Sequence, residues 1–194
     1  MAKTLLGLIL AFISLAGSTG AYASMQEGVT AYQKGNYAVA LKELRPLADK
    51  GDAKAQALLG EIYDNGKGVP QDHKEAALWL RKAAEQGDMN AQAYLGVMYE
   101  RGIGVTHDDR ESAAWYRKAA EQGSAEAQFT LGGKYKDGRG VPADLVQAHK
   151  WLGLAVASGF DIAQQDMEEI EARMNRKQIE EAQLLEKEWL AKHP

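Results

Sequence analysis

Residues 52–123 read DAKAQALLGEIYDNGKGVPQDHKEAALWLRKAAEQG and then DMNAQAYLGVMYERGIGVTHDDRESAAWYRKAAEQG. The two segments align without a gap, and a third, SAEAQFTLGGKYKDGRGVPADLVQAHKWLGLAVASG, continues from Ser124, so the pattern recurs every 36 residues. A fixed period of this length is typical of repeat proteins, in which stacked neighbours build the core that no unit can bury alone. The sequence therefore predicts an elongated scaffold with one extended binding face.

Each repeat carries the signals of two helices. The first helix follows a glycine and an N-cap residue, and the second begins at an aspartate with Glu or Gln three residues later, the pattern of a capping box. Two glycines and a valine between the helices predict a chain reversal. We therefore expect an all-α fold, a right-handed α-solenoid of antiparallel helix pairs. The predicted N-cap residues are Asp52, Asp88 and Ser124, then Asp72, Asp108 and Asp144.

The repeated residues also predict the core. One face of each first helix is apolar, as in the series Ala55, Leu59 and Tyr63. A glycine follows the leucine in all three repeats; because a mid-helix glycine costs about 1 kcal/mol relative to alanine, it predicts a second helix that crosses too closely for a Cβ. Each second helix carries a tryptophan, which we interpret as core between repeats, with a surface that stacks sugars or cations as the alternative. These residues are Gly60, Gly96 and Gly132, and Trp79, Trp115 and Trp151.

The segments that flank the repeats have helical patterns of their own. Residues 24–51 predict one more helix pair with a short loop and with Pro46 inside its second helix. Residues 160–194 predict two amphipathic helices with charged outer faces, which suits a terminal cap; dimerisation through these helices is the alternative. The predicted segments are 1–23, 24–51, 52–87, 88–123, 124–159 and 160–194.

The N-terminus predicts export. It reads MAKTLLGLILAFISLAGSTGAYAS, with one lysine, an apolar run from Leu5 to Gly17, and small residues at Ala21 and Ala23. This is the pattern of a secretory signal peptide cleaved before Ser24. The run of about 13 residues is shorter than the roughly 20 that a membrane-spanning helix needs. We therefore expect a periplasmic protein that does not span the membrane after cleavage, with release from the cell as the alternative.

Composition excludes several classes of function. The net charge is −4, and removal of residues 1–23 takes away one lysine. Lysines and arginines alternate with acidic residues, so the chain lacks the basic stripe that nucleic-acid binding requires. The absence of cysteine excludes disulfides, thiol catalysis and a thiolate zinc site. Stability must come from packing alone.

No catalytic pattern stands out. The chain has no Gly-x-Ser-x-Gly elbow, no His-Glu-x-x-His and no EF-hand spacing. The four histidines fall at different repeat positions, and the His107-Asp108-Asp109 run is best explained as a helix cap in a solvated loop. We therefore predict no catalytic residue, no metal site and no cofactor.

The pattern A-Q-x-x-L-G-x-x-Y-x-x-G-x-G-V, followed by D, A-x-x-W and K-A-A-x-x-G, resembles the Sel-one-like repeats, relatives of tetratricopeptide repeats. The match covers 52–159 and is strongest in 52–123; residues 28–51 look like a tetratricopeptide-type pair. The resemblance implies an adaptor that organises other proteins, and exported members are associated with envelope assembly, polysaccharide export and interaction with host cells. A cysteine-rich branch is linked to β-lactam binding and hydrolysis, and this chain lacks the cysteines of that branch.

Positions that vary between repeats predict where a partner binds. On a concave groove, Tyr94, Met98 and Lys134 are the expected contacts, because aromatic, methionine and basic side chains suit peptide anchoring. The alternative is that Tyr94 and Met98 belong to the core. The variable positions are Leu58, Glu61 and Ile62, then Tyr94, Val97 and Met98, then Thr130, Gly133 and Lys134.

The sequence therefore predicts a non-catalytic scaffold of the bacterial envelope that binds a protein or peptide partner. Two alternatives stay open. One is an envelope enzyme, or a carbohydrate- or peptidoglycan-interacting protein of the β-lactam-binding type. The other is a secreted factor that binds a host protein.

Overall fold

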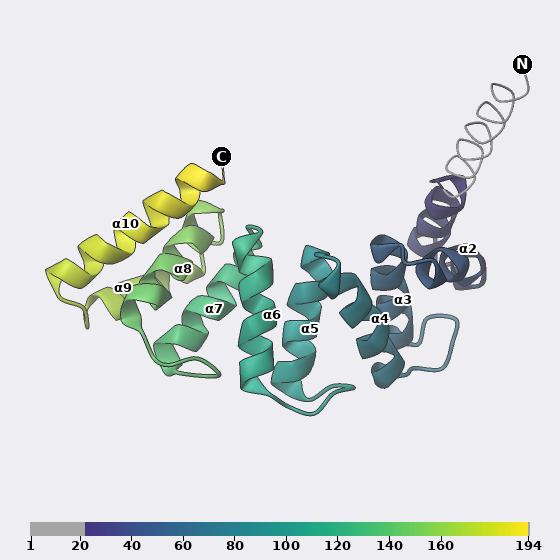
Figure 1. The fold of residues 1–194 in the computed structure, drawn as a ribbon, viewed down its shortest axis with the longest axis horizontal. Helices are drawn as coiled ribbons and strands as arrows, with labels where there is room; N and C mark the ends of the chain where they lie inside the picture. The colour runs from purple at the N-terminus through teal and green to yellow at the C-terminus, as the bar shows by residue number, and fades with distance from the viewer. Residues whose placement is uncertain (1–21, 194) are drawn as a thin grey trace, which may run out of the picture. The chain divides into compact units, whose positions relative to one another are not determined.

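The computed structural model describes residues 22–193, and every regular element in that range is an α-helix (Figure 1). The described residues belong to two compact units that divide between Ala83 and Ala84. Of the predicted signal peptide, only Tyr22 and Ala23 fall within the described residues.

The first unit contains the helical residues 22–33, α2 (Tyr37–Asp49), α3 (Ala53–Asn65) and most of α4 (His73–Glu85). The helix α2 continues through Pro46. One apolar cluster joins the elements and includes Leu44, Leu59 and Trp79. The unit therefore has a core of its own.

The second unit contains the helix pairs of the second and third repeats, followed by a C-terminal pair. Within it α5 packs on α6, α6 on α7, and α7 on α8, while α9 and α10 both pack on α8 (Figure 1). Its elements are α5 (Met89–Arg101), α6 (Asp109–Glu121), α7 (Ala125–Asp137), α8 (Leu145–Ala157), α9 (Ala163–Glu171) and α10 (Arg176–Lys192).

The predicted N-caps are confirmed, but the capping boxes are not complete. The Asp108 side chain accepts hydrogen bonds from the N–H groups of Arg110 and Glu111. The reciprocal half of the box is missing because the Asp108 N–H donates to the Tyr99 carbonyl at 3.0 Å. The same backbone bond recurs from Asp72 to Tyr63 and from Asp144 to Tyr135. This bond ties the start of each second helix to the end of the first.

The mid-helix glycines mark close helix crossings, as predicted. A Cβ on Gly60 would lie 2.5 Å from Leu80 Cγ, and one on Gly132 would lie 2.7 Å from Leu152 Cγ. A Cβ on Gly96 would lie 3.0 Å from the Tyr116 ring. Contacts of this length are repulsive, so glycine sets the spacing of the two helices in a pair.

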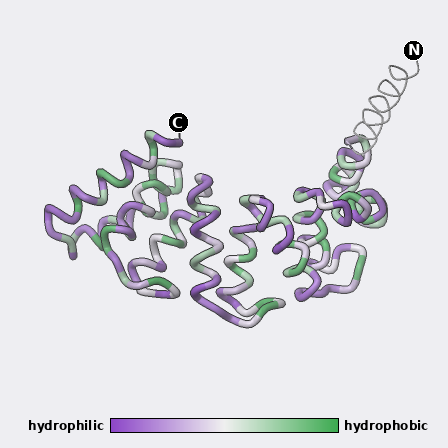
Figure 2. Tube along the Cα trace, in the orientation of Figure 1, coloured by the Kyte–Doolittle hydropathy of each residue, from purple (hydrophilic) through white to green (hydrophobic). Residues whose placement is uncertain are grey.

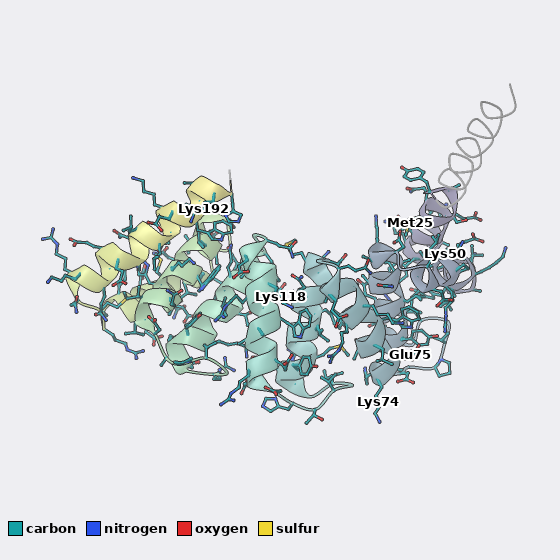
Figure 3. The ribbon with its side chains drawn as sticks, viewed as in Figure 1. Met25, Lys50, Lys74, Glu75, Lys118 and Lys192 are labelled. Carbon is teal, nitrogen blue, oxygen red and sulfur yellow. The ribbon has the colours of Figure 1, made fainter. Side chains whose placement is uncertain are left out.

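The tryptophans are core residues and not a sugar-stacking surface. Trp79, Trp115 and Trp151 are all buried. Lysine side chains lie over the faces of these rings: Lys118 Nζ lies 3.8 Å from the Trp115 ring centroid. Figure 3 labels Lys118 on α6. Lys82 covers Trp79 in the same way at 3.9 Å. Each lysine keeps its ammonium group over the ring while its stem shields the indole from water.

The glutamine of the A-Q motif has a structural role that sequence reasoning missed. The side chains of Gln56, Gln92 and Gln128 are buried, and each donates to a carbonyl in the last turn of the preceding second helix. The donor–acceptor distances are 3.0, 3.0 and 3.1 Å. The carbonyls at a helix C-terminus lack intrahelical partners, so this side chain links one repeat to the next.

The C-terminal helices place the predicted apolar residues toward the last repeat. Ala163 and Ile170 of α9 are buried against α8, and Trp189 of α10 packs on the cluster that contains Trp151. Figure 2 shows polar and hydrophobic residues interleaved along the helices. Among residues 22–193, no helix is both long and apolar enough to span a bilayer.

Candidate functional site

A buried lysine in the second unit, Lys134, is the centre of a cluster of ion pairs. Lys134 of α7 occupies the repeat position of Ile62 and Met98, and its side chain is 0% exposed. Its Nζ lies 3.0 Å from Glu100 Oε1 and 3.3 Å from Asp109 Oδ1. A charge in such a place is stable only when it is paired, so these three groups act as one cluster.

This burial corrects the predicted contacts. Met98 and Lys134 are 1% and 0% exposed, so neither side chain lies in a groove where a partner could touch it. Both residues lie on a buried face of their helix, and Lys134 points to Glu100 and Asp109 of the preceding repeat. Tyr94 is half-buried and stays a prediction.

Two other variable positions, Thr130 and Gly133, do line a cavity. The cavity lies on the first-helix face of the second unit, where residues of α5, α7 and α9 come together, and has a volume of about 370 Å³. Such a volume is at the small end of ligand pockets and suits a side chain. The lining residues are Glu100, Phe129, Thr130, Gly133, Lys136, Asp137, Arg139 and Asp166.

The cavity depends on Gly133. A Cβ placed on this glycine would have nothing within 4 Å, whereas one on the neighbouring Gly132 would have Leu152 at 2.7 Å. Packing therefore requires Gly132 and does not require Gly133. The first two repeats have Glu61 and Val97 at the position of Gly133, side chains that would occupy this space.

Ion pairs surround the opening of the cavity. Lys136 Nζ lies 3.0 Å from Asp166 and 3.5 Å from Glu169, and the hydrogen bond to Asp166 raises the pKa of Lys136. Arg139 is half-exposed and makes only long contacts, 3.5 Å to Glu100 and 3.6 Å to Asp137. Lys136 is thus closely paired, whereas the ion pairs of Arg139 with Glu100 and Asp137 are longer and more exposed.

A buried tyrosine lies beside the ion cluster formed by Lys134, Glu100 and Asp109. Tyr116 of α6 is buried, and its ring lies 5.8 Å from Lys134 Nζ. Burial first, and the charge of Glu100 second, raise the pKa of Tyr116 well above its usual value. The hydroxyl therefore stays neutral and is no candidate nucleophile.

A second buried ion cluster lies at the C-terminal end of the same unit. His149 of α8 is 2% exposed, with Nδ1 2.7 Å from Glu186 of α10 and Nε2 2.8 Å from Glu171 of α9. Burial lowers the pKa of His149, but the hydrogen bonds that its ring donates to Glu186 and Glu171 outweigh burial and raise the pKa overall. The histidine is therefore a structural link among three helices.

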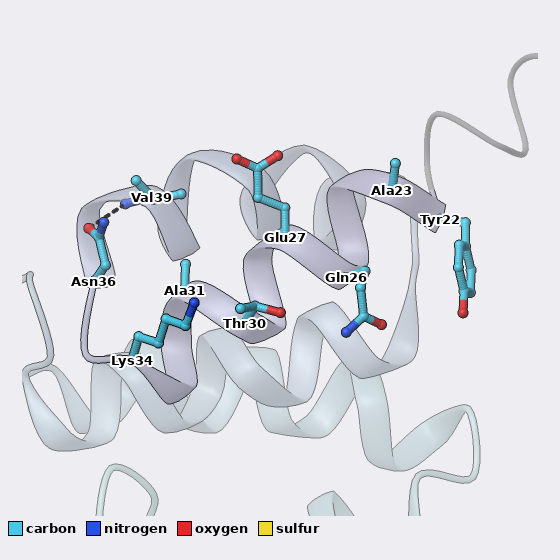
Figure 4. Close-up of a pocket in the computed structure, with 9 residues that line it drawn as sticks. All are labelled: Tyr22, Ala23, Gln26, Glu27, Thr30, Ala31, Lys34, Asn36 and Val39. Atoms are coloured by element: carbon cyan, nitrogen blue, oxygen red, sulfur yellow. Dashed lines mark hydrogen bonds between the residues drawn. The ribbon is translucent and has the colours of Figure 1, made fainter.

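A larger cavity lies in the first unit, along the helical residues 22–33 (Figure 4). Its volume is about 710 Å³, and Asn36 at its edge accepts a hydrogen bond from the Val39 N–H. Tyr22 and Ala23 form part of its wall, and both precede the predicted cleavage point. We therefore take the cavity at Gly133 as the candidate site.

The described residues offer little to a metal ion. Within residues 22–193, no three histidine, aspartate or glutamate side chains gather in a geometry that could hold one. Asp108, the centre of the His107-Asp108-Asp109 run, is used as an N-cap. Asp109 is paired with Lys134.

Comparison with known proteins identifies the family. Residues 53–88, 90–124 and 125–160 match the model of the Sel1 repeat. This chain belongs to the Sel1 repeat family. The match and the solved neighbours establish an all-α solenoid of Sel1 repeats, related to tetratricopeptide repeats.

Two solved structures are similar to this Sel1 repeat chain. A Sel1 repeat protein from Oxalobacter formigenes is 36% identical, with a TM-score of 0.70, over 72% of this chain and 58% of that one. The protein c5321, a protective antigen present in uropathogenic Escherichia coli strains, is 28% identical, with a TM-score of 0.61, over 91% of this chain and 46% of that one. This chain thus spans about half the length of either protein. No curated protein matches it.

Sel1 repeat proteins are generally protein-interaction scaffolds and are typically non-catalytic. For this Sel1 repeat chain, the arrangement at Gly133 provides a small cavity with one aromatic wall and charged edges. Such an arrangement can hold a side chain of a bound protein, because shape and charge together select among side chains.

Proposed function

We propose that this Sel1 repeat protein is a non-catalytic scaffold of the bacterial cell envelope, which binds a peptide segment of a partner protein along the first-helix face of its second unit. One observation carries the proposal. The cavity opens where the third repeat has Thr130 and Gly133 in place of the larger Tyr94 and Val97 of the second. Both positions vary between repeats and line a cavity, so a partner can reach them.

The envelope location is part of the proposal and rests on the N-terminal sequence. An apolar run of about 13 residues followed by Ala21 and Ala23 fits a cleavable signal peptide. Expression of the full chain with a C-terminal tag should give a periplasmic protein that begins at Ser24, measured by fractionation and intact mass. A full-length protein in the cytoplasm would contradict the export proposal.

The second candidate function is that of a secreted factor that binds a host protein, and one similar protein favours it. The similar protein c5321 is a protective antigen of uropathogenic Escherichia coli strains. If this chain has such a role, the tagged protein should leave the cells and appear in the culture medium. Retention of the whole protein in the periplasm would contradict this candidate and favour the envelope scaffold.

The binding function is tested by capture. Residues 24–194 are immobilised and exposed to an envelope extract, alongside a double variant Thr130→Tyr and Gly133→Val. The variant places in the third repeat the residues that the second repeat already has, so its fold should be preserved. A protein retained by the native form and not by the variant is the expected result. Retention of no protein, or hydrolysis of a chromogenic β-lactam by the pure protein, would contradict the proposal.

A further inference from the structure

The cavity at Gly133 contains features that indicate which side chain of a partner it accepts. Glycine in the middle of α7 costs about 1 kcal/mol relative to alanine, and no neighbour demands it. The adjacent Gly132 is explained by Leu152, whereas Gly133 faces open space. The glycine therefore maintains a volume that any other residue would reduce.

The wall of this volume is aromatic. Phe129, one turn before Gly133, lines the cavity and packs on Phe160 with a ring-centroid distance of 5.2 Å. The Phe129 ring also joins the apolar cluster of α8 and α9, which fixes its position. A fixed aromatic wall favours an aliphatic stem or a cation over its face.

The charges around the cavity have an acidic excess. Three cations are paired there with five carboxylates, because each cation lies between two carboxylates and Glu100 is shared. Lys134 lies between Glu100 and Asp109, Arg139 between Glu100 and Asp137, and Lys136 between Asp166 and Glu169. Of these charged groups, the cavity itself is lined by three carboxylates and two cations, which are Glu100, Asp137 and Asp166 with Lys136 and Arg139, so its lining carries one more carboxylate than cations.

The carboxylates that line the cavity differ in how readily each can pair with a cation of a bound partner. Glu100 is held by the buried Lys134, and Asp166 by Lys136 at 3.0 Å. Asp137 is about half-exposed, and its ion pair with Arg139 is long, at 3.6 Å. Asp137 is thus the carboxylate that an incoming cation reaches with least disturbance.

We propose that this cavity binds an arginine or lysine side chain of the partner peptide, with the stem against Phe129 and the charged end at Asp137 and Asp166. This proposal rests on the proposed scaffold function and specifies the partner's chemistry. The cavity volume of about 370 Å³ accommodates one such side chain together with part of its neighbour. Binding of a cation in a partly buried acidic site should weaken as salt is raised.

The test uses peptide pools of matched shape. Three pools of acetylated, amidated nonapeptides carry arginine, citrulline or glutamate at the central position, with the other positions randomised. Citrulline has the shape of arginine without its charge. The immobilised protein, residues 24–194, should retain about ten times more of the arginine pool than of the citrulline pool. Equal retention of the two pools, preference for the glutamate pool, or retention of none would overturn the proposal.

Variants connect the preference to the cavity. Gly133→Val should fill the volume and abolish the arginine preference, and its melting temperature should equal or exceed that of the native protein. Asp137→Asn should weaken the preference, whereas Asp49→Asn, the same change on α2, should leave it intact. An arginine preference that survives Gly133→Val would overturn the proposal. If the envelope partner still binds the Gly133→Val variant, the scaffold function stands and the cavity assignment fails.

Discussion

Two adjacent residues of α7, Gly132 and Gly133, are glycine for different physical reasons. Gly132 is required by packing, because a Cβ there would lie 2.7 Å from Leu152 Cγ and 3.3 Å from the Ala148 carbonyl oxygen. A Cβ on Gly133 would have no neighbour within 4 Å. The first is a structural residue and the second a candidate binding residue, although both are the same amino acid one position apart.

Substitution by alanine should separate the two roles. Gly132→Ala should destabilise the protein by about 1–3 kcal/mol, because the added carbon overpacks the helix crossing. Gly133→Ala should stabilise it by about 1 kcal/mol, since helix propensity improves without a clash. Urea denaturation of both variants measures the difference. Equal destabilisation by both would show that Gly133 is also a packing residue.

The buried Lys134 shows where reasoning from equivalent positions failed. The first two repeats have Ile62 and Met98 at its position, and both are buried. Equivalence between repeats therefore predicts a buried side chain at Lys134 as well. The residues that neutralise Lys134, Glu100 and Asp109, lie in the preceding repeat. A charged residue in a repeat position that is otherwise apolar, together with Asp109 where the first repeat has His73, was the signal in the sequence that could have revealed this cluster.

Replacement of this lysine tests the pairing. Lys134→Met introduces the side chain found at Met98, so any loss of stability reflects the charges left behind and not the shape. We expect a loss of about 2 kcal/mol, because Glu100 and Asp109 then lose their shared cation. Adding Asp109→Asn to Lys134→Met should recover part of the lost free energy of unfolding, as measured by urea denaturation. A Lys134→Met protein as stable as the native one would contradict the ion cluster.

At the scale of helices, the sequence predicted most of the structure. Periodic N-cap residues located the helix starts, and glycines located the turns, because both depend on local backbone chemistry. The capping boxes were incomplete because a carbonyl of another helix, such as that of Tyr99, takes the N–H of the cap residue. Such a bond depends on tertiary packing and leaves no local pattern.

The contact of α8 with the C-terminal helices also depends on tertiary packing. Gly153 of α8 departs from the arginine found at this position in the first two repeats, and a Cβ there would collide with the Glu186 carboxylate of α10. The glycine thus makes room for the acidic group that pairs with His149. The departure is visible in the sequence, but its reason lies in the packing of α10.

This link should make the stability of the second unit depend on pH. The pKa of His149 is raised in the folded protein above its ordinary value of 6.5. The protonated ring is therefore favoured by folding, and its contribution is fully present below pH 6.5 and is lost as the pH rises through the raised pKa. The melting temperature should fall as the pH increases above 6.5, while a His149→Gln variant should show a smaller change. A stability that increases over this interval because of His149 would contradict the link.

At the scale of the whole molecule, the sequence predicted the family and the repeated helix pairs but not the cavity. The 36-residue period is a property of the chain itself. The cavity needs residues from α5, α7 and α9, among them Glu100, Gly133 and Asp166, whose proximity follows only from stacking. Sequence variation did mark Thr130 and Gly133, but it marked the buried Lys134 in the same way.

The central claim is that this Sel1 repeat protein binds a partner protein at the Gly133 cavity. Capture from an envelope extract by residues 24–194, with the Thr130→Tyr and Gly133→Val double variant in parallel, tests it most directly. We expect a protein that the native form retains and the folded variant does not. Equal retention by both forms would contradict the claim and would place binding on another surface.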